Sequence, residues 1–163
     1  MSTDLHAARP QNPWRVGFVF AITLATALAG GIPTSHANSI TFQASVVDVK
    51  SGDTLIVLRN NTKITVVLPG VDAPELDQPY GPEAKKFTAK LVKGQVVTIE
   101  TFGASDPLVG AVHFGKNKVL ATELVKAGLA WTKAMDSFSQ LGQLQEDAKK
   151  SHRGIWSNEE EEP

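Results

Sequence analysis

Hydrophobic and β-branched residues are concentrated in five short segments, each bounded by glycine, proline, asparagine or aspartate. This pattern is typical of β-strands separated by turns. Asn60-Asn61 lies between the second and the third segment, which predicts a hairpin. The expected strands are residues 41–49, 54–59, 63–68, 95–101 and 109–114.

Apolar residues at helical spacing predict three helices. Ala84, Phe87 and Leu91 recur at i, i+3 and i+7 after Pro82, a residue that a first helical turn accepts. The expected helices cover about 81–93, 119–127 and 138–153, and a glycine follows each of them. The order β-β-β-α-β-β-α-α favours an α+β, mainly β fold, in which a small closed barrel of five strands packs against three helices.

The first part of the chain has the pattern of an export signal. Residues 16–32 carry no charge, they follow Arg9 and Arg15, and small residues flank His36 at the positions that signal peptidase reads. We expect residues 1–37 to be a signal peptide and the protein to be exported, periplasmic or extracellular. The alternative is an uncleaved membrane anchor, because 17 uncharged residues are close to the lower limit for a membrane span.

The remaining chain suits one domain, expected at residues 38–157, with an acidic, disordered tail at 158–163. It contains no cysteine, so no disulfide stabilises it. Without the leader the formal charge is −2, and without the four tail glutamates as well it is +2. Neither value is that of a strongly basic nucleic-acid binder.

Three carboxylates lie in two loops that one hairpin separates. Asp53 belongs to the motif SGDT, whereas Asp72 and Glu75 belong to GVDAPE. Each motif alone is explained by the chemistry of turns, in which aspartate and proline are common. Together they predict that neighbouring strands bring the three carboxylates to one end of the barrel.

The chain resembles the thermonuclease (staphylococcal nuclease-like) family. The motifs GDT, VDAPE, YGPEA, FTAKLV, KAGLAW and GIWS follow in the family's order between about Val46 and Ser157, and Asp72 stands 19 positions after Asp53 as in the family pattern. The resemblance implies an oligonucleotide/oligosaccharide-binding barrel with three helices. It also implies Ca²⁺-dependent hydrolysis of phosphodiester bonds in DNA or RNA.

The resemblance also implies roles for the residues of the two loops. Asp53, Asp72 and the main-chain carbonyl of Ala73 match the positions that hold Ca²⁺ in the family, and a hard cation prefers such oxygen ligands. Glu75 matches the residue that activates or orients the attacking water. The family has threonine where Ala73 stands. This difference does not remove the ligand, because the main-chain carbonyl is present with either side chain.

Two arginines of the family pattern are absent. Their positions hold Val67 and, in the register of a loop that matches less well, Leu108. No register restores them, because no arginine occurs between Arg59 and Arg153. An arginine that stabilises the transition state of phosphoryl transfer is worth roughly 10³ to 10⁵ in rate, so we expect a feeble enzyme at most.

Other cations are poor substitutes on sequence grounds. Lys63 lies beside the hairpin turn, and the strand parity of His113 differs from that of Leu108. Lysines of the first expected helix form either a phosphate-tracking stripe or an ordinary solvated face. They are Lys85, Lys86, Lys90 and Lys93.

Three hypotheses follow. The first is a degenerate nuclease that keeps the metal carboxylates, binds Ca²⁺ and binds nucleotides or single strands weakly. The second is a working Ca²⁺-dependent nuclease that uses another cation or a second metal. The third is a protein-interaction module on the same barrel, which needs neither metal nor nucleic acid.

Overall fold

The computed structural model describes residues 39–101, 103–133 and 139–157. All of them belong to the compact unit His36–Pro163. The expected leader, residues 1–37, and the expected acidic tail, 158–163, lie outside the described residues, as do Asn38 and the first residue of the third expected helix. Within the described ranges, no helix has both the length and the apolar character that a membrane span requires.

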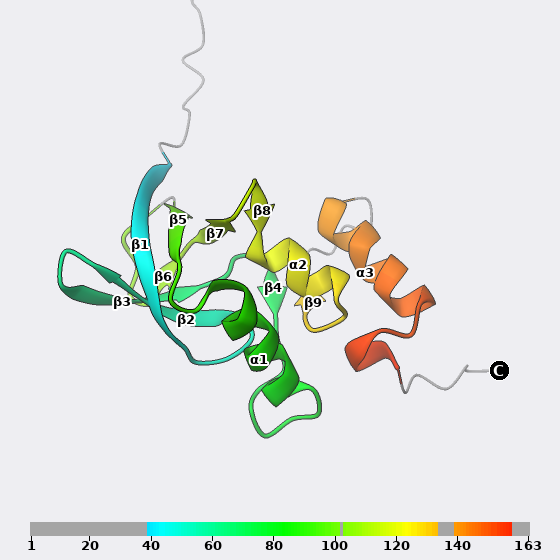
Figure 1. Ribbon diagram of the computed structural model, residues 1–163. Coiled ribbons are helices and arrows are strands. Elements are labelled where there is room, and N and C mark those ends of the chain that lie inside the picture. The colour runs from blue at the N-terminus through cyan, green and yellow to red at the C-terminus, as the bar shows by residue number, and fades with distance from the viewer. Residues whose placement is uncertain (1–38, 102, 134–138, 158–163) are drawn as a thin grey trace, which may run out of the picture. The chain divides into compact units, whose positions relative to one another are not determined.

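The sheet is built from the five expected strands, and one of them divides in two (Figure 1). The fifth expected strand forms β6 and β7, with Gly110 between them. Very short strands, which have too few residues to show a period in the sequence, were not predicted. The main strands are β1 (Ile40–Val49), β2 (Thr54–Arg59), β3 (Thr62–Val67), β5 (Val96–Thr101), β6 (Leu108–Val109) and β7 (Ala111–Phe114), and the unpredicted ones are β4 (Val71–Asp72), β8 (Lys118–Val119) and β9 (Trp131–Thr132).

The pairing of the strands closes the barrel. β1 is antiparallel to β2 and to β5, and β2 is antiparallel to β3. At the two open edges, β6 pairs parallel with β3 while β7 pairs antiparallel with β5. Gly110 joins β6 to β7, and its N–H donates to the carbonyl of Val67 (3.1 Å). One continuous segment therefore links both edges, which confirms the five-stranded oligonucleotide/oligosaccharide-binding barrel.

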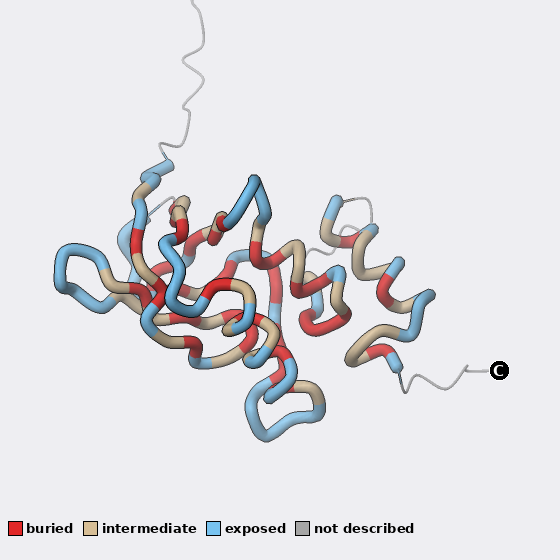
Figure 2. Tube along the Cα trace, viewed as in Figure 1, coloured by how far each residue is buried: buried red, intermediate tan, exposed pale blue. Residues whose placement is uncertain are grey.

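The barrel interior is filled by the alternate residues of each strand (Figure 2). In β2, for example, Leu55 and Val57 are fully buried. β1 departs from strict alternation, because the register shifts between Val46 and Asp48, and this bulge allows Val46 and Val49 both to face the core. Apolar burial of this kind is the main stabilising contribution to the fold.

The described residues also form three α-helices: α1 (Gly81–Val92), α2 (Leu120–Lys126) and α3 (Gln140–Lys150). α1 buries Ala84, Thr88 and Val92, a spacing of four residues, so its inner face is rotated slightly from the expected one. α3 begins after Ser139, whose Oγ accepts a hydrogen bond from the N–H of Gly142 (3.0 Å). A short 3₁₀ helix, Gly154–Trp156, follows it.

Candidate functional site

The two acidic loops lie side by side, as the sequence predicts. Asp53 immediately precedes β2, and its carbonyl accepts a hydrogen bond from the N–H of Leu68 (2.9 Å), just after β3. Its carboxylate Oδ2 lies 3.4 Å from the N–H of Ala73. Since Asp72 is the neighbour of Ala73, the hairpin brings the carboxylate-bearing residues of both motifs to the same end of the barrel.

Asp53 is a buried, oriented carboxylate. The residue is only 8% exposed. Its Oδ1 accepts hydrogen bonds from the hydroxyls of Ser51 (2.7 Å) and Thr54 (3.1 Å). No lysine, arginine or histidine of the described ranges forms an ion pair with it. A buried negative charge without a cation is costly, so this position favours the binding of one.

Asp72 is exposed and belongs to a small two-stranded sheet. It pairs in register with Trp131 of β9. Its side chain is 60% exposed, and Oδ1 lies 3.5 Å from the ammonium of Lys133. The neighbouring Ala73 is buried, with 6% exposure.

The donor set fits a hard divalent cation. Asp53 and Asp72 supply carboxylate oxygens, which is the chemistry that Ca²⁺ prefers, whereas the main chain of Ala73 contacts Asp53 through its N–H. In the part of the chain that the structure describes, no three acidic, histidine or cysteine side chains form a metal-binding group. A cation at this place would therefore depend on main-chain and water oxygens to complete its coordination.

Close packing of the first helix holds the two loops together. A Cβ atom added to Gly52 would lie 2.6 Å from the Cβ of Ala73 and 2.8 Å from the Cβ of Ala84 in α1. The hydroxyl of Thr88, also in α1, donates to the carbonyl of Gly52 (2.5 Å). Only glycine allows this approach, so the SGDT motif is specified by packing as well as by its carboxylate.

Glu75 has a fixed main chain and an exposed side chain. Its N–H donates to the side-chain Oε1 of Gln78 (2.8 Å), and its carbonyl accepts from the N–H of the same residue (2.9 Å). The carbonyl also lies against Gly81, where an added Cβ would approach it to 1.8 Å. Gln78 was not singled out in the sequence. A glutamine that closes a turn on its own loop leaves no recognisable motif.

The two positions that hold arginine in the family pattern face opposite sides of the barrel wall. Leu108 pairs with Val66, is 8% exposed and belongs to the core. Val67 is the next residue in β3, so its side chain points outward. Its partner in β6 is Val109, which is 47% exposed. The outward position beside Val67 is therefore that of Val109 rather than Leu108.

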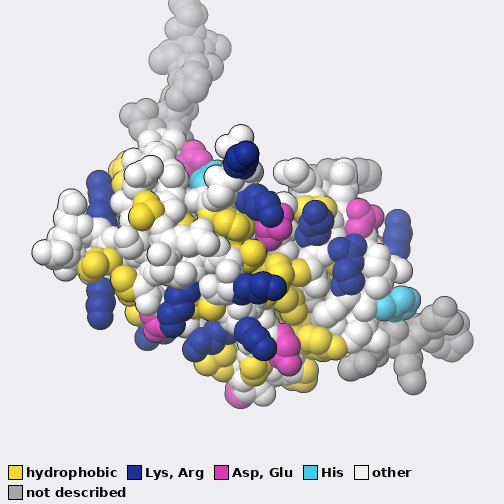
Figure 3. Space-filling view, viewed as in Figure 1, with side chains coloured by type: hydrophobic (Ala, Val, Ile, Leu, Met, Phe, Trp, Pro, Cys, Tyr) yellow, Lys and Arg dark blue, Asp and Glu magenta, His cyan; other side chains and the backbone are white. Residues whose placement is uncertain are grey.

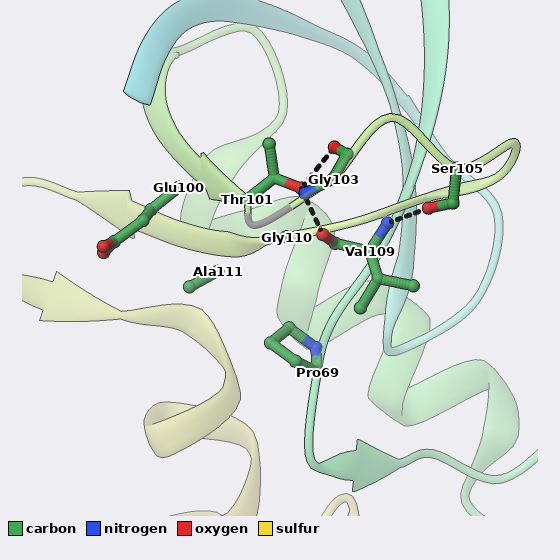
Figure 4. Close-up of a pocket in the computed structure, with 8 residues that line it drawn as sticks. All are labelled: Pro69, Glu100, Thr101, Gly103, Ser105, Val109, Gly110 and Ala111. Atoms are coloured by element: carbon green, nitrogen blue, oxygen red, sulfur yellow. Dashed lines mark hydrogen bonds between the residues drawn. The ribbon is translucent and has the colours of Figure 1, made fainter. Parts of the chain in front are cut away.

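A pocket of about 380 Å³ adjoins Val109 (Figure 4). Figure 4 shows the side chain of Val109 on the same side as the ring of Pro69, while Ser105 Oγ accepts from the N–H of Val109 (3.2 Å). The lining contains no lysine or arginine. It consists of Pro69, Glu100, Thr101, Gly103, Ser105, Val109, Gly110 and Ala111.

Neither arginine of the described ranges forms an ion pair with the carboxylates of the two loops. The guanidinium of Arg59 lies 4.1 Å from the ring centroid of Phe42. Arg59 ends β2 whereas Asp53 precedes it, which separates them by roughly 20 Å at the usual strand rise. Arg153 donates to the main-chain carbonyl of Lys126 (2.5 Å), near the end of α2.

The two other side chains that could replace the absent arginines, Lys63 and His113, form their contacts away from the two acidic loops. Lys63 pairs with Leu58 near the hairpin turn. His113 Nε2 lies 3.4 Å from Glu100 Oε2, on β7 and β5.

Within the described residues, the lysines of α1 and Lys93, which follows it, form no ion pair with Asp53, Asp72 or Glu75. Lys93 Nζ lies 3.4 Å from Asp48 Oδ1, and a hydrogen bond from the N–H of Val49 together with Lys93 lowers the pKa of Asp48. Figure 3 shows lysine and arginine side chains spread over this face among hydrophobic and acidic ones.

The comparisons with known proteins agree with the fold. The family model described as staphylococcal nuclease homologue matches residues 65–158. A protein of Escherichia coli O157:H7 named uncharacterized endonuclease is 31% identical over 121 residues, which cover 72% of this chain and 79% of that protein. The thermonuclease of Staphylococcus hyicus is 33% identical over 138 residues, which cover 76% of this chain and 80% of that protein. The chain therefore belongs to the staphylococcal nuclease homologue family.

Proposed function

We propose that this protein is a calcium-binding, nuclease-like phosphodiesterase of low activity, acting on single-stranded DNA or RNA. The observation that carries the proposal is the buried carboxylate of Asp53, which no cation of the described ranges neutralises and which lies beside Ala73 and hence Asp72. The family supports a nuclease-like activity. The apolar residues at the arginine positions, Val67 and Leu108, and the apolar outward neighbour Val109 support the low rate.

The chemistry would be hydrolysis of a phosphodiester. Ca²⁺, held by Asp53, Asp72 and the carbonyl of Ala73, would polarise the phosphate when bound. Glu75 would accept a proton from a water molecule as the water oxygen attacks phosphorus. The bond from phosphorus to the leaving oxygen breaks, and that oxygen takes a proton from solvent. The products are a phosphate monoester and an alcohol.

The rate is limited by charge on the nonbridging phosphate oxygens. Val67 and Val109 present only methyl groups where the strands pair on the outer face of the barrel. A transition-state arginine contributes roughly 4 to 7 kcal/mol. Losses of two cooperating groups do not simply add, but even one such loss gives a slow enzyme.

The test is cleavage of single-stranded DNA by the purified protein, with Ca²⁺ or with a chelator. We expect slow, chelator-sensitive cleavage that Glu75→Gln abolishes. Glu83→Gln is the matched control, because Glu83 is also an exposed glutamate, in the first turn of α1. Cleavage that persists in chelator, or that both variants reduce equally, would contradict the proposed site.

Calcium binding is measured separately by calorimetry. Wild type should release heat on Ca²⁺ binding and Asp72→Ala should not. Equal and negligible heats for both would favour a protein-interaction module on the same barrel instead.

We also propose that the protein is exported through its N-terminal leader. The support is the uncharged stretch 16–32 and the small residues around His36. N-terminal sequencing of the protein from the producing cell tests this. A chain that starts at Asn38 agrees with cleavage, whereas an intact N-terminus in the membrane fraction indicates an anchor.

A further inference from the structure

We propose that Lys133 is a phosphate-binding cation of this site and takes over part of the role of the absent arginines. The proposal rests on the proposed function, because it concerns the same metal carboxylates. It starts from one contact: the ammonium of Lys133 lies 3.5 Å from Oδ1 of Asp72. No other lysine or arginine in the described ranges pairs with Asp53, Asp72 or Glu75.

The backbone of Lys133 is attached to the loop that carries Asp72. Its N–H donates to the carbonyl of Gly70 (2.9 Å). The preceding strand β9 pairs with β4 through Val71 and Thr132. The N–H of Thr132 also donates to Oε1 of Gln145 in α3 (2.8 Å). These hydrogen bonds fix the backbone of Lys133 relative to the loop that carries Asp72. The long side chain of Lys133 can still change its conformation.

The ion pair itself contributes little to stability, which leaves the ammonium available. The side chains of Lys133 and Asp72 are 56% and 60% exposed, and ion pairs at such exposure are weak because water screens them. Lysine is a compact point charge that commonly binds phosphate. A phosphate drawn to a cation on Asp72 would come within reach of the same lysine.

A competing reading is that Lys133 only blocks Asp72 and opposes the metal. The two readings differ in what removal of the charge does. If Lys133 binds phosphate, Lys133→Gln weakens oligonucleotide binding and leaves calcium binding nearly unchanged. If it only blocks, the same variant tightens calcium binding and leaves oligonucleotide binding the same or stronger.

The experiment measures the affinity of a fluorescently labelled single-stranded oligodeoxynucleotide by anisotropy, with Ca²⁺, in the full chain carrying Glu75→Gln to prevent turnover. We expect Lys133→Gln to weaken binding roughly tenfold and to lower the slope of log affinity against log salt by about 0.7. Lys133→Arg should retain the affinity. Calcium calorimetry on each variant provides the second measurement.

The matched control is Lys118→Gln. Lys118 lies in another two-residue strand, β8, its side chain is 53% exposed, and it forms an ion pair with the partly buried Glu123 (3.7 Å). Equal effects of the two lysine changes would overturn the proposal, because they would show only a loss of net charge. Normal calcium binding with no effect of Lys133→Gln would overturn it while the proposed function stands. Absence of both calcium and oligonucleotide binding in the parent protein would overturn both.

Discussion

An arginine introduced at Leu108 should have a very different effect from one introduced at Val109. Leu108 is 8% exposed and packs in the core, and burial of a leucine side chain stabilises a fold by about 1.5 to 3 kcal/mol. Arginine at this place loses that contribution and brings a charge towards the interior. Because its long stem can carry the guanidinium out through the barrel end, we expect a loss of about 3 kcal/mol rather than more. Val109 is 47% exposed and faces outward, so arginine there should cost within about 1 kcal/mol.

Thermal unfolding followed by circular dichroism measures the difference. A loss of about 3 kcal/mol lowers the melting temperature of a domain of this size by roughly 10 °C. Val96→Arg is the control for a change of valine to arginine on an exposed strand, since Val96 is 62% exposed. If Leu108→Arg melts within 3 °C of Val109→Arg, a margin of about 1 kcal/mol, then Leu108 does not face the core, and the assignment of the outward position to Val109 fails.

Three further predictions concern the function of the site. The double variant Val67→Arg with Val109→Arg should raise calcium-dependent cleavage by at least about tenfold, and an unchanged rate would mean that more than the cations is lacking. Gly52→Ala should lower the free energy of unfolding by about 1 to 3 kcal/mol through overpacking and weaken calcium binding. Gly103→Ala is the control and should do neither, because a Cβ added there meets nothing within 4 Å. Equal calcium affinities of the two variants would refute the packing argument. Gln78→Ala should reduce the cleavage rate while it lowers unfolding free energy by only about 1 kcal/mol, and a full-rate variant would show that this turn does not position the general base.

The strands and helices could be predicted because each is several residues long and buries one regular face. The period of two in Thr54–Arg59 and the helical spacing after Gly81 result directly from that burial. The strands β4 and β9 have two residues each and no period, so nothing in the sequence indicates their pairing. Yet this pairing carries Asp72 and brings Lys133 to it. The part of the site that depends on long-range contact between irregular segments was therefore not predictable from the pattern.

Some features of the candidate site residues could also be predicted from the sequence, and others could not. Asp53 and Asp72 could be predicted to approach one another, because a hairpin returns the chain to the same end of the barrel. The inward orientation of Leu108 could not, since β6 has only two residues and the preceding loop sets its register. A shift by one residue reverses the face of every side chain in a strand. This is why the outward neighbour of Val67 became apparent only from the pairing with Val109.

The charge of the site explains why the loss of two arginines should make it depend more strongly on a divalent cation. Asp53, Asp72, Glu75 and Lys133 together carry a formal charge of −2, and a phosphodiester adds a further negative charge for each phosphate. Two arginines would have brought the formal charge of the protein residues at this site from −2 to zero. Without them the bare site repels its substrate, and a divalent cation restores neutrality. We therefore expect oligonucleotide binding to disappear in chelator rather than merely weaken, and substantial binding without Ca²⁺ in the same anisotropy assay would show that nucleic acid reaches the protein by another surface.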